Sequence, residues 1–75
     1  MRIISQDKSY SFEFSDHDIR QADEYLYCVT ATRDVVIGKY DNEHRASEVF
    51  EMIHDEAKRE NVGISSLKVF RLPEE

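Results

Sequence analysis

Three histidines and 16 acidic residues are the side chains of this 75-residue chain that could bind a metal ion or transfer a proton. His17 lies between Asp16 and Asp18, but adjacent residues do not easily converge on one ion, and the segment lacks the glycine and terminal glutamate of a calcium loop. His44 and His54 fall on one predicted helix, ten residues and therefore roughly 80° apart around its axis. No metal or cofactor site is predicted, and a small metal-dependent enzyme using these histidines is kept only as the last of three functional interpretations.

The single cysteine, Cys28, is the only candidate for a thiol nucleophile. A nucleophilic cysteine needs a lowered pKa and a nearby base, whereas Cys28 lies in the middle of a predicted strand, where a buried small hydrophobic residue is expected. One cysteine also excludes an intramolecular disulfide, which small secreted domains usually need. With no signal-like leader and no apolar run of membrane-spanning length, we expect a cytoplasmic protein that does not bind a membrane. Because no catalytic motif is found, we also expect that it is not an enzyme.

Two features of the sequence indicate binding. Between residues 13 and 24, five carboxylates accompany a single arginine, a local charge of −4 that could dock on a basic surface or imitate nucleic-acid phosphates. Tyrosines are favoured at protein interfaces because the ring buries apolar area while the hydroxyl stays polar. A solvated loop and tyrosines packed under a helix are the alternative interpretations. The predicted partner-binding residues are Asp16, Asp18, Glu24, Tyr25 and Tyr27.

Size and charge limit the functions that the chain can have. A chain of 75 residues forms one domain, residues 1–75, and buries only about 60% of its unfolded surface on folding. Side chains that would line a large enclosed pocket are needed to fill the core, so a surface function or a site shared between subunits is favoured. The formal net charge of −6 opposes direct binding of nucleic acid, whose phosphates are contacted mainly by Lys and Arg.

Hydrophobic periodicity predicts the secondary structure. Alternating aromatic residues between 8 and 14 are typical of a half-buried strand, and residues 24–32 are rich in aromatic and β-branched types. Polar residues 15–23 predict a loop, with a weak helical turn as the alternative over 18–22. Further strands are expected at residues 2–5, 35–40 and 66–72. Residues 32–34 are expected to reverse the chain between two strands and so to give a hairpin.

One long helix is predicted after Asp41, whose carboxylate can cap the free amides of the first turn. The helix ends at Asn61 or Gly63. Its apolar stripe follows helical spacing and comprises Ala46, Val49, Phe50, Ile53 and Ala57. The predicted fold is therefore α+β, an antiparallel sheet of four or five strands with one long helix packed on one face, in the order β-β-β-β-α-β.

Three segments carry a resemblance. The opening MRIISQD, the middle IGKYDNEHRASEVFEMI and the closing VFRLPEE resemble a group of short, uncharacterised proteins of Gram-positive bacteria and their phages and prophages. Those proteins typically begin MRIISQDG, carry G-x-Y-[ST]-x-E-x-A-x-x-V before a helix, and finish near Phe-x-x-Pro. This chain departs in having Lys8 where Gly is usual and Asp41 where Ser or Thr is usual. The resemblance carries over no catalytic residue, and it implies a phage or mobile-element accessory protein.

The leading functional interpretation is accordingly a non-enzymatic protein-interaction module with a protein partner, acting in the cytoplasm of a bacterial or phage-infected cell. A homodimer through a sheet face or edge is one form that this interaction takes. The first alternative is an acidic inhibitor that occupies the nucleic-acid site of a host defence or regulatory protein.

Overall fold

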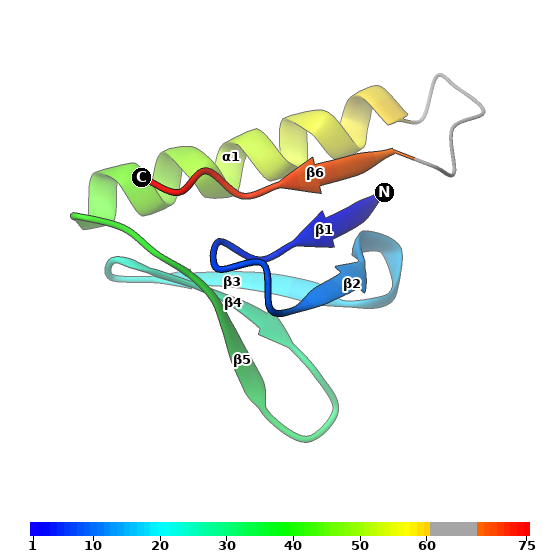
Figure 1. Ribbon diagram of the computed structural model, residues 1–75, viewed down its shortest axis with the longest axis horizontal. Coiled ribbons are helices and arrows are strands. Elements are labelled where there is room, and N and C mark those ends of the chain that lie inside the picture. Colours follow the sequence, from blue (N-terminus) through cyan, green and yellow to red (C-terminus); the bar gives the residue numbers. More distant parts are fainter. Residues whose placement is uncertain (61–67) are drawn as a thin grey trace.

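A computed structural model describes residues 1–60 and 68–75 of the chain (Figure 1). Its fold is α+β, as predicted. Along the sequence, the elements are β1 (Arg2–Ile4), β2 (Ser11–Glu13), the short 3-10 helix η1 (Phe14–Asp16), β3 (Asp18–Ala22), β4 (Tyr25–Val29), β5 (Asp34–Lys39), α1 (Glu43–Glu60) and β6 (Val69–Arg71). No helix in the described part of the chain is long and apolar enough to cross a membrane.

The described strands form two three-stranded sheets, in the orders β2-β1-β6 and β3-β4-β5, and not the single antiparallel sheet of four or five strands that was predicted. The β3-β4-β5 sheet is antiparallel throughout. In the other sheet, β1 is antiparallel to β2 but parallel to β6, with Ile3 opposite Phe70. A parallel pair needs a long connection between its strands, and α1 lies within the one that links these two. Short-range alternation in sequence carries no information about this long-range pairing.

β3 replaces most of the loop predicted for residues 15–23, so the strands and the α-helix follow one another along the chain as β-β-β-β-β-α-β. It pairs antiparallel with β4, with Ile19 opposite Cys28 and Arg20 opposite Tyr27. Ile19 packs against the core, whereas the alternate residues Asp18 and Arg20 are exposed. An edge strand with a single inward apolar residue gives a weak hydrophobic pattern, which is why the sequence predicts a loop here.

The predicted β4–β5 hairpin forms. Its turn is held by Thr30, whose Oγ1 accepts a hydrogen bond from the amide of Arg33 at 3.1 Å and donates to its carbonyl at 2.6 Å. Tyr27 lies opposite Val36 and Leu26 opposite Gly38, so Ile37 is the extra residue of a β-bulge. The bulge directs Ile37 into the core, where it is 2% exposed.

α1 begins one residue later than predicted. The side chain of Asn42, and not that of Asp41, accepts a hydrogen bond from the amide of Arg45 at 2.8 Å, so Asn42 is the N-cap. Both residue types cap well, and sequence alone does not distinguish neighbouring positions. The predicted stripe is confirmed, with three members fully buried and Phe50 and Ala57 packed against the same core. The predicted helix end at residue 61 or 63 lies outside the described residues.

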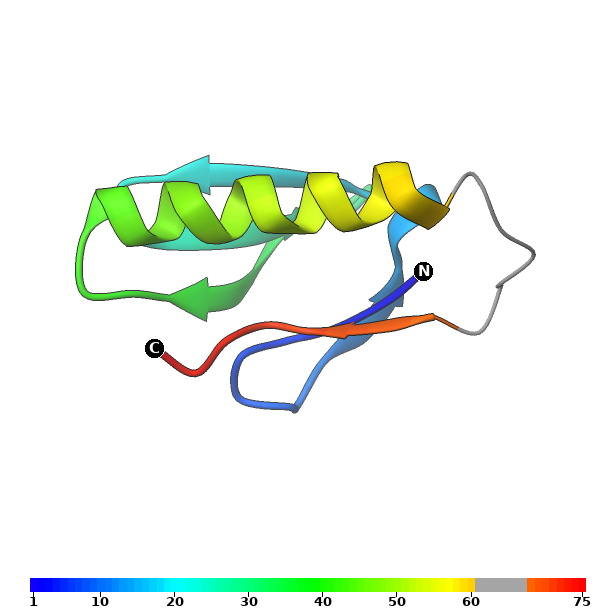
Figure 2. The same ribbon diagram turned by 90° about the horizontal axis from the view of Figure 1, so that it is seen from above.

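The core lies between α1 and the inner faces of both sheets. Figure 2 shows α1 running alongside β3 and β4, with the β2-β1-β6 sheet on the other side of the molecule. Each layer contributes fully buried side chains, represented by Ile3, Leu26 and Ile53. The two sheets therefore share one hydrophobic core.

Gln6, in the turn between β1 and β2, connects three segments that are distant in sequence. Its backbone amide donates to the carbonyl of Ile37 at 2.8 Å. Its side-chain Oε1 accepts from the amide of Lys39, and its Nε2 donates to the carbonyls of Lys39 and Glu74, each at 2.8 Å. Gln6 thus joins the first sheet to the edge of β5 and to the C-terminal segment.

The G-x-Y sequence at residues 38–40 has a packing explanation. The ring of Tyr40 lies over Gly38, so that a Cβ at position 38 would be 2.9 Å from Cε2 of the ring. The Tyr40 hydroxyl donates to the carbonyl of Pro73 at 2.8 Å, and burial raises the pKa of Tyr40 to about 12. This motif therefore stabilises the contact between β5 and the C-terminal segment.

Candidate interaction surface on the β3-β4-β5 sheet

The outer face of the β3-β4-β5 sheet carries the predicted tyrosines. Leu26 and Cys28 point to the core and are 0% exposed, whereas the alternating residues of β4 point to the opposite side. α1 packs against the inner side of this sheet. We call the outer side the tyrosine face, and by register it comprises Asp18, Arg20, Ala22, Tyr25, Tyr27, Val29, Asp34, Val36 and Lys39.

Cationic side chains hold the two tyrosine rings in place. The guanidinium carbon of Arg20 lies 4.5 Å from the centre of the Tyr27 ring. Nε and Nη2 of Arg20 also donate to Oδ2 of Asp34, at 3.1 and 2.7 Å. Nζ of Lys39 lies 5.9 Å from the centre of the Tyr25 ring, and the two rings are 6.1 Å apart. Such cation–π contacts stabilise exposed aromatic rings by about 0.5–1 kcal/mol each, so they favour this arrangement of the two rings.

The middle of the face is apolar and accessible. Val36 is 51% exposed, although it lies directly opposite the half-buried Tyr27. Isolated apolar residues are normal on a protein surface, but here the valine lies opposite Tyr27, whose ring is 6.1 Å from that of Tyr25. The face therefore combines the exposed Val36 and the tyrosine rings with the charged residues that surround them, and Arg20 covers part of Tyr27.

The structure brings together only part of the predicted partner-binding set. Tyr25, Tyr27 and Asp18 lie on the tyrosine face, with Asp18 opposite Val29 at its end. Asp16 belongs to η1, outside the sheet, and Glu24 lies in the turn between β3 and β4. β3 begins at Asp18 and spans roughly 13 Å, four steps of about 3.3 Å, so Glu24 lies beyond the far end of the strand from Asp18 and Asp16. The predicted acidic patch is therefore divided between the two ends of β3, with Arg20 in the middle of the strand.

Sequence reasoning missed Arg20, Val36 and Lys39 as members of this face. These three residues lie opposite Tyr25 and Tyr27 on the two neighbouring strands. The sequence indicates this position only when residues 18–22 are known to form a strand.

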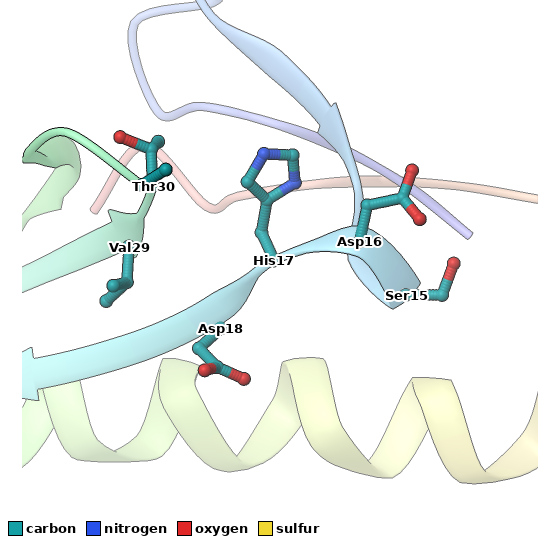
Figure 3. A pocket seen from close by; sticks show the side chains of 7 residues that line it. Ser15, Asp16, His17, Asp18, Val29 and Thr30 are labelled. Carbon is teal, nitrogen blue, oxygen red and sulfur yellow. The ribbon is translucent and has the colours of Figure 1, made fainter.

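An open hollow of about 350 Å³ lies beside the face, lined by Ser15, Asp16, His17, Asp18, Val29, Thr30 and Ala31. Figure 3 shows the side chains of Asp16, His17 and Asp18 pointing in three different directions. The ring packs edge-on against Phe12, with centroids 5.5 Å apart. Within residues 1–60 and 68–75, no three His, Cys, Asp or Glu side chains are grouped closely enough to hold a metal ion.

The other residues considered for chemistry have separate surroundings. Nδ1 of His54 lies 2.8 Å from the carbonyl oxygen of Phe50, one helical turn earlier, while Nε2 of the exposed His44 lies 3.5 Å from a carboxylate oxygen of Glu48. Cys28 is fully buried, as predicted, and this burial raises the pKa of its thiol. A thiol with a raised pKa and no access to solvent is a poor nucleophile.

The fold and this surface together define a small α+β domain with two neighbouring tyrosines on the outer face of one sheet. Comparison with protein-family models, with curated proteins and with solved structures found no match to the chain.

Proposed function

We propose that the protein is a non-enzymatic protein-interaction module and that the tyrosine face is its contact surface. The observation that supports this most directly is the pair of tyrosine rings, 6.1 Å apart and flanked by Arg20 and Lys39, beside the half-exposed Val36. Tyrosine and arginine are enriched among the residues that dominate binding energy at protein interfaces. The flanking cations favour one arrangement of the rings, which lowers the free energy that a partner loses in fixing them.

The partner proposed for this face is a protein surface with an apolar centre. Its margin would place charges opposite Asp18 and Lys39, which lie at different corners of the face. The resemblance of the opening, middle and closing segments to short phage and prophage proteins supports an accessory role in a bacterial or phage-infected cell, with a cytoplasmic location.

The acidic-inhibitor alternative has weaker support. A phosphate-imitating surface needs carboxylates in a continuous array, whereas β3 separates Glu24 from Asp16 and Asp18. Arg20 lies between them and is itself paired with Asp34 at 2.7 Å. The proposal of a metal-dependent enzyme has no grouped ligands among the described residues to support it.

Affinity capture with matched variants tests the proposed function. The wild-type chain and the double variant Tyr25→Ser/Tyr27→Ser are each immobilised and exposed to a lysate of phage-infected Gram-positive cells. Met52→Ser is the control, because Met52 is 38% exposed but lies on α1, away from the tyrosine face. We expect wild type and the Met52 variant to retain the same protein and the tyrosine variant to lose it. Equal capture by all three folded proteins would contradict the proposal.

A further inference from the structure

β3 is an edge strand with an open side. In the order β3-β4-β5, β3 has a hydrogen-bonded neighbour only on the β4 side within the described residues. Every second residue of an edge strand directs its N–H and C=O groups away from the sheet, where they can pair with another strand. The opposite edge, β5, is partly covered, because Gln6 bonds to the backbone of Ile37 and Lys39. On the outer side of β3, by contrast, no described segment donates or accepts a backbone hydrogen bond, although α1 packs against this strand from the inner face.

The charges on β3 favour one particular antiparallel pairing with a second copy. Asp18 and Arg20 are two residues apart and so point to the same face of the sheet. A symmetric pairing centred on Ile19 places Asp18 of each copy opposite Arg20 of the other. A pairing centred on Arg20 would instead place two arginines opposite one another, and like charges in that position destabilise a sheet.

We propose that β3 pairs with β3 of a second copy in an antiparallel register centred on Ile19, giving a two-fold symmetric homodimer with a continuous six-stranded sheet. Such an interface uses the same residues from both copies. The dimer deepens the proposed interaction function by naming the partner at the sheet edge, and it joins the two tyrosine faces into one surface. Its test does not involve the tyrosines, so the two proposals can fail separately.

The side chains at this edge are suited to the pairing. Asp18 is exposed and makes no hydrogen bond or ion pair with another described residue, so its carboxylate is available. Arg20 lies over Tyr27 and donates to Asp34 on the β5 side, away from the open edge, so in the dimer its guanidinium must turn from Asp34 to Asp18 of the second copy. Ile19 is half-buried against the core and would meet its counterpart at the centre of the interface.

Net charge opposes the association, since each copy carries a formal charge of −6. At physiological ionic strength the Debye length is about 8 Å, so distant repulsion is screened and the close Asp18–Arg20 pairs decide the register. A five-residue edge buries less than the roughly 1,200–2,000 Å² of a standard stable interface. The dimer is therefore weak and depends on protein concentration.

Sedimentation velocity of variants with exchanged charges tests the proposal. The full chain is measured at concentrations up to about 1 mM, so that a dimer with a weak dissociation constant is still detected. Wild type should shift from monomer towards dimer as its concentration rises. Asp18→Arg and Arg20→Asp should each weaken dimerisation at least tenfold, because each places like charges opposite one another. An equimolar mixture of the two variants should form a heterodimer, since one copy then presents two cations and the other two anions.

Two controls separate the register from other effects. Asp34→Asn removes the internal partner of Arg20 but leaves the edge charges in place, and it should still dimerise. Asp16→Arg makes the same charge change outside β3 and should also dimerise. If Arg20→Asp does not fold, the comparison of Asp18→Arg with Asp16→Arg decides the case. A wild type that stays monomeric throughout, equal dimerisation by Asp18→Arg and Asp16→Arg, or a folded mixture that does not associate would each overturn the proposal.

Discussion

Replacing Gln6 by alanine should destabilise the protein although the residue lies in a turn. The substitution removes three side-chain hydrogen bonds of 2.8 Å, two to Lys39 and one to Glu74, and retains the backbone bond to Ile37. A hydrogen bond contributes about 0.5–1.5 kcal/mol net to stability, and water partly replaces these bonds because the site is exposed. We expect the free energy of unfolding to fall by about 1–2 kcal/mol, which corresponds to roughly 5–15 °C in Tm for a domain of this size.

Urea denaturation followed by circular dichroism measures this loss, and two further variants sharpen it. Gln6→Glu keeps an acceptor for the Lys39 amide but places a carboxylate against two carbonyl oxygens, so it should be at least as unstable as Gln6→Ala at neutral pH. Gln21→Ala is the control, because Nε2 of Gln21 donates only to the nearby carbonyl of Asp23. A Gln6→Ala variant as stable as Gln21→Ala would refute the view that Gln6 connects the two sheets.

Two further predictions concern the turn that Gln6 begins. Lys8 has φ of 66°, in the left-handed region that costs an ordinary residue about 1–2 kcal/mol, so Lys8→Gly should raise the free energy of unfolding by about 1 kcal/mol in the same denaturation assay. Hydrogen bonds from the side chain and backbone of Ser9 and the hydroxyl of Ser5 lower the pKa of Asp7 from 3.8 to about 2. Because the pKa of Asp7 is lower in the folded state, its contribution to the free energy of unfolding is complete above about pH 4 and is lost as the pH falls towards 2. Thermal unfolding across this range should therefore show a smaller pH dependence for Asp7→Asn than for wild type. An identical pH dependence of the two proteins would contradict the assignment.

Local patterns in the sequence predict the helix and most strands well. The apolar stripe of α1 and the aromatic alternation before residue 14 are strong signals because both set a buried face. β3 gives little signal, since only Ile19 among its first three residues faces the core. The parallel pairing of β1 with β6 depends on contacts across almost the whole chain, which periodicity does not encode.

The sequence also predicts only part of the candidate site, because local alternation does not reveal contacts between strands. Alternation within residues 24–32 correctly places Tyr25 and Tyr27 together on one face and Cys28 on the other. Asp16 and Glu24 are close in sequence, but the extended β3 separates them, and a loop would not have done so. Arg20 reaches Asp34 on β5 across Tyr27, a contact between three strands that exists only in the assembled sheet.

The β1–β6 pairing also affects how the chain folds during synthesis. Arg2 pairs with Val69, so the sheet that contains Ile3 is completed only after nearly the whole sequence has been translated. Ribosomes add roughly 5–20 residues per second, which leaves Ile3 and Phe12 without β6 for on the order of several seconds. The β3-β4-β5 sheet has only local pairings and can form first, with α1 packing on it next. During this interval β1 exposes an unpaired edge in the nascent chain, and this is the stage at which the protein is most prone to aggregate.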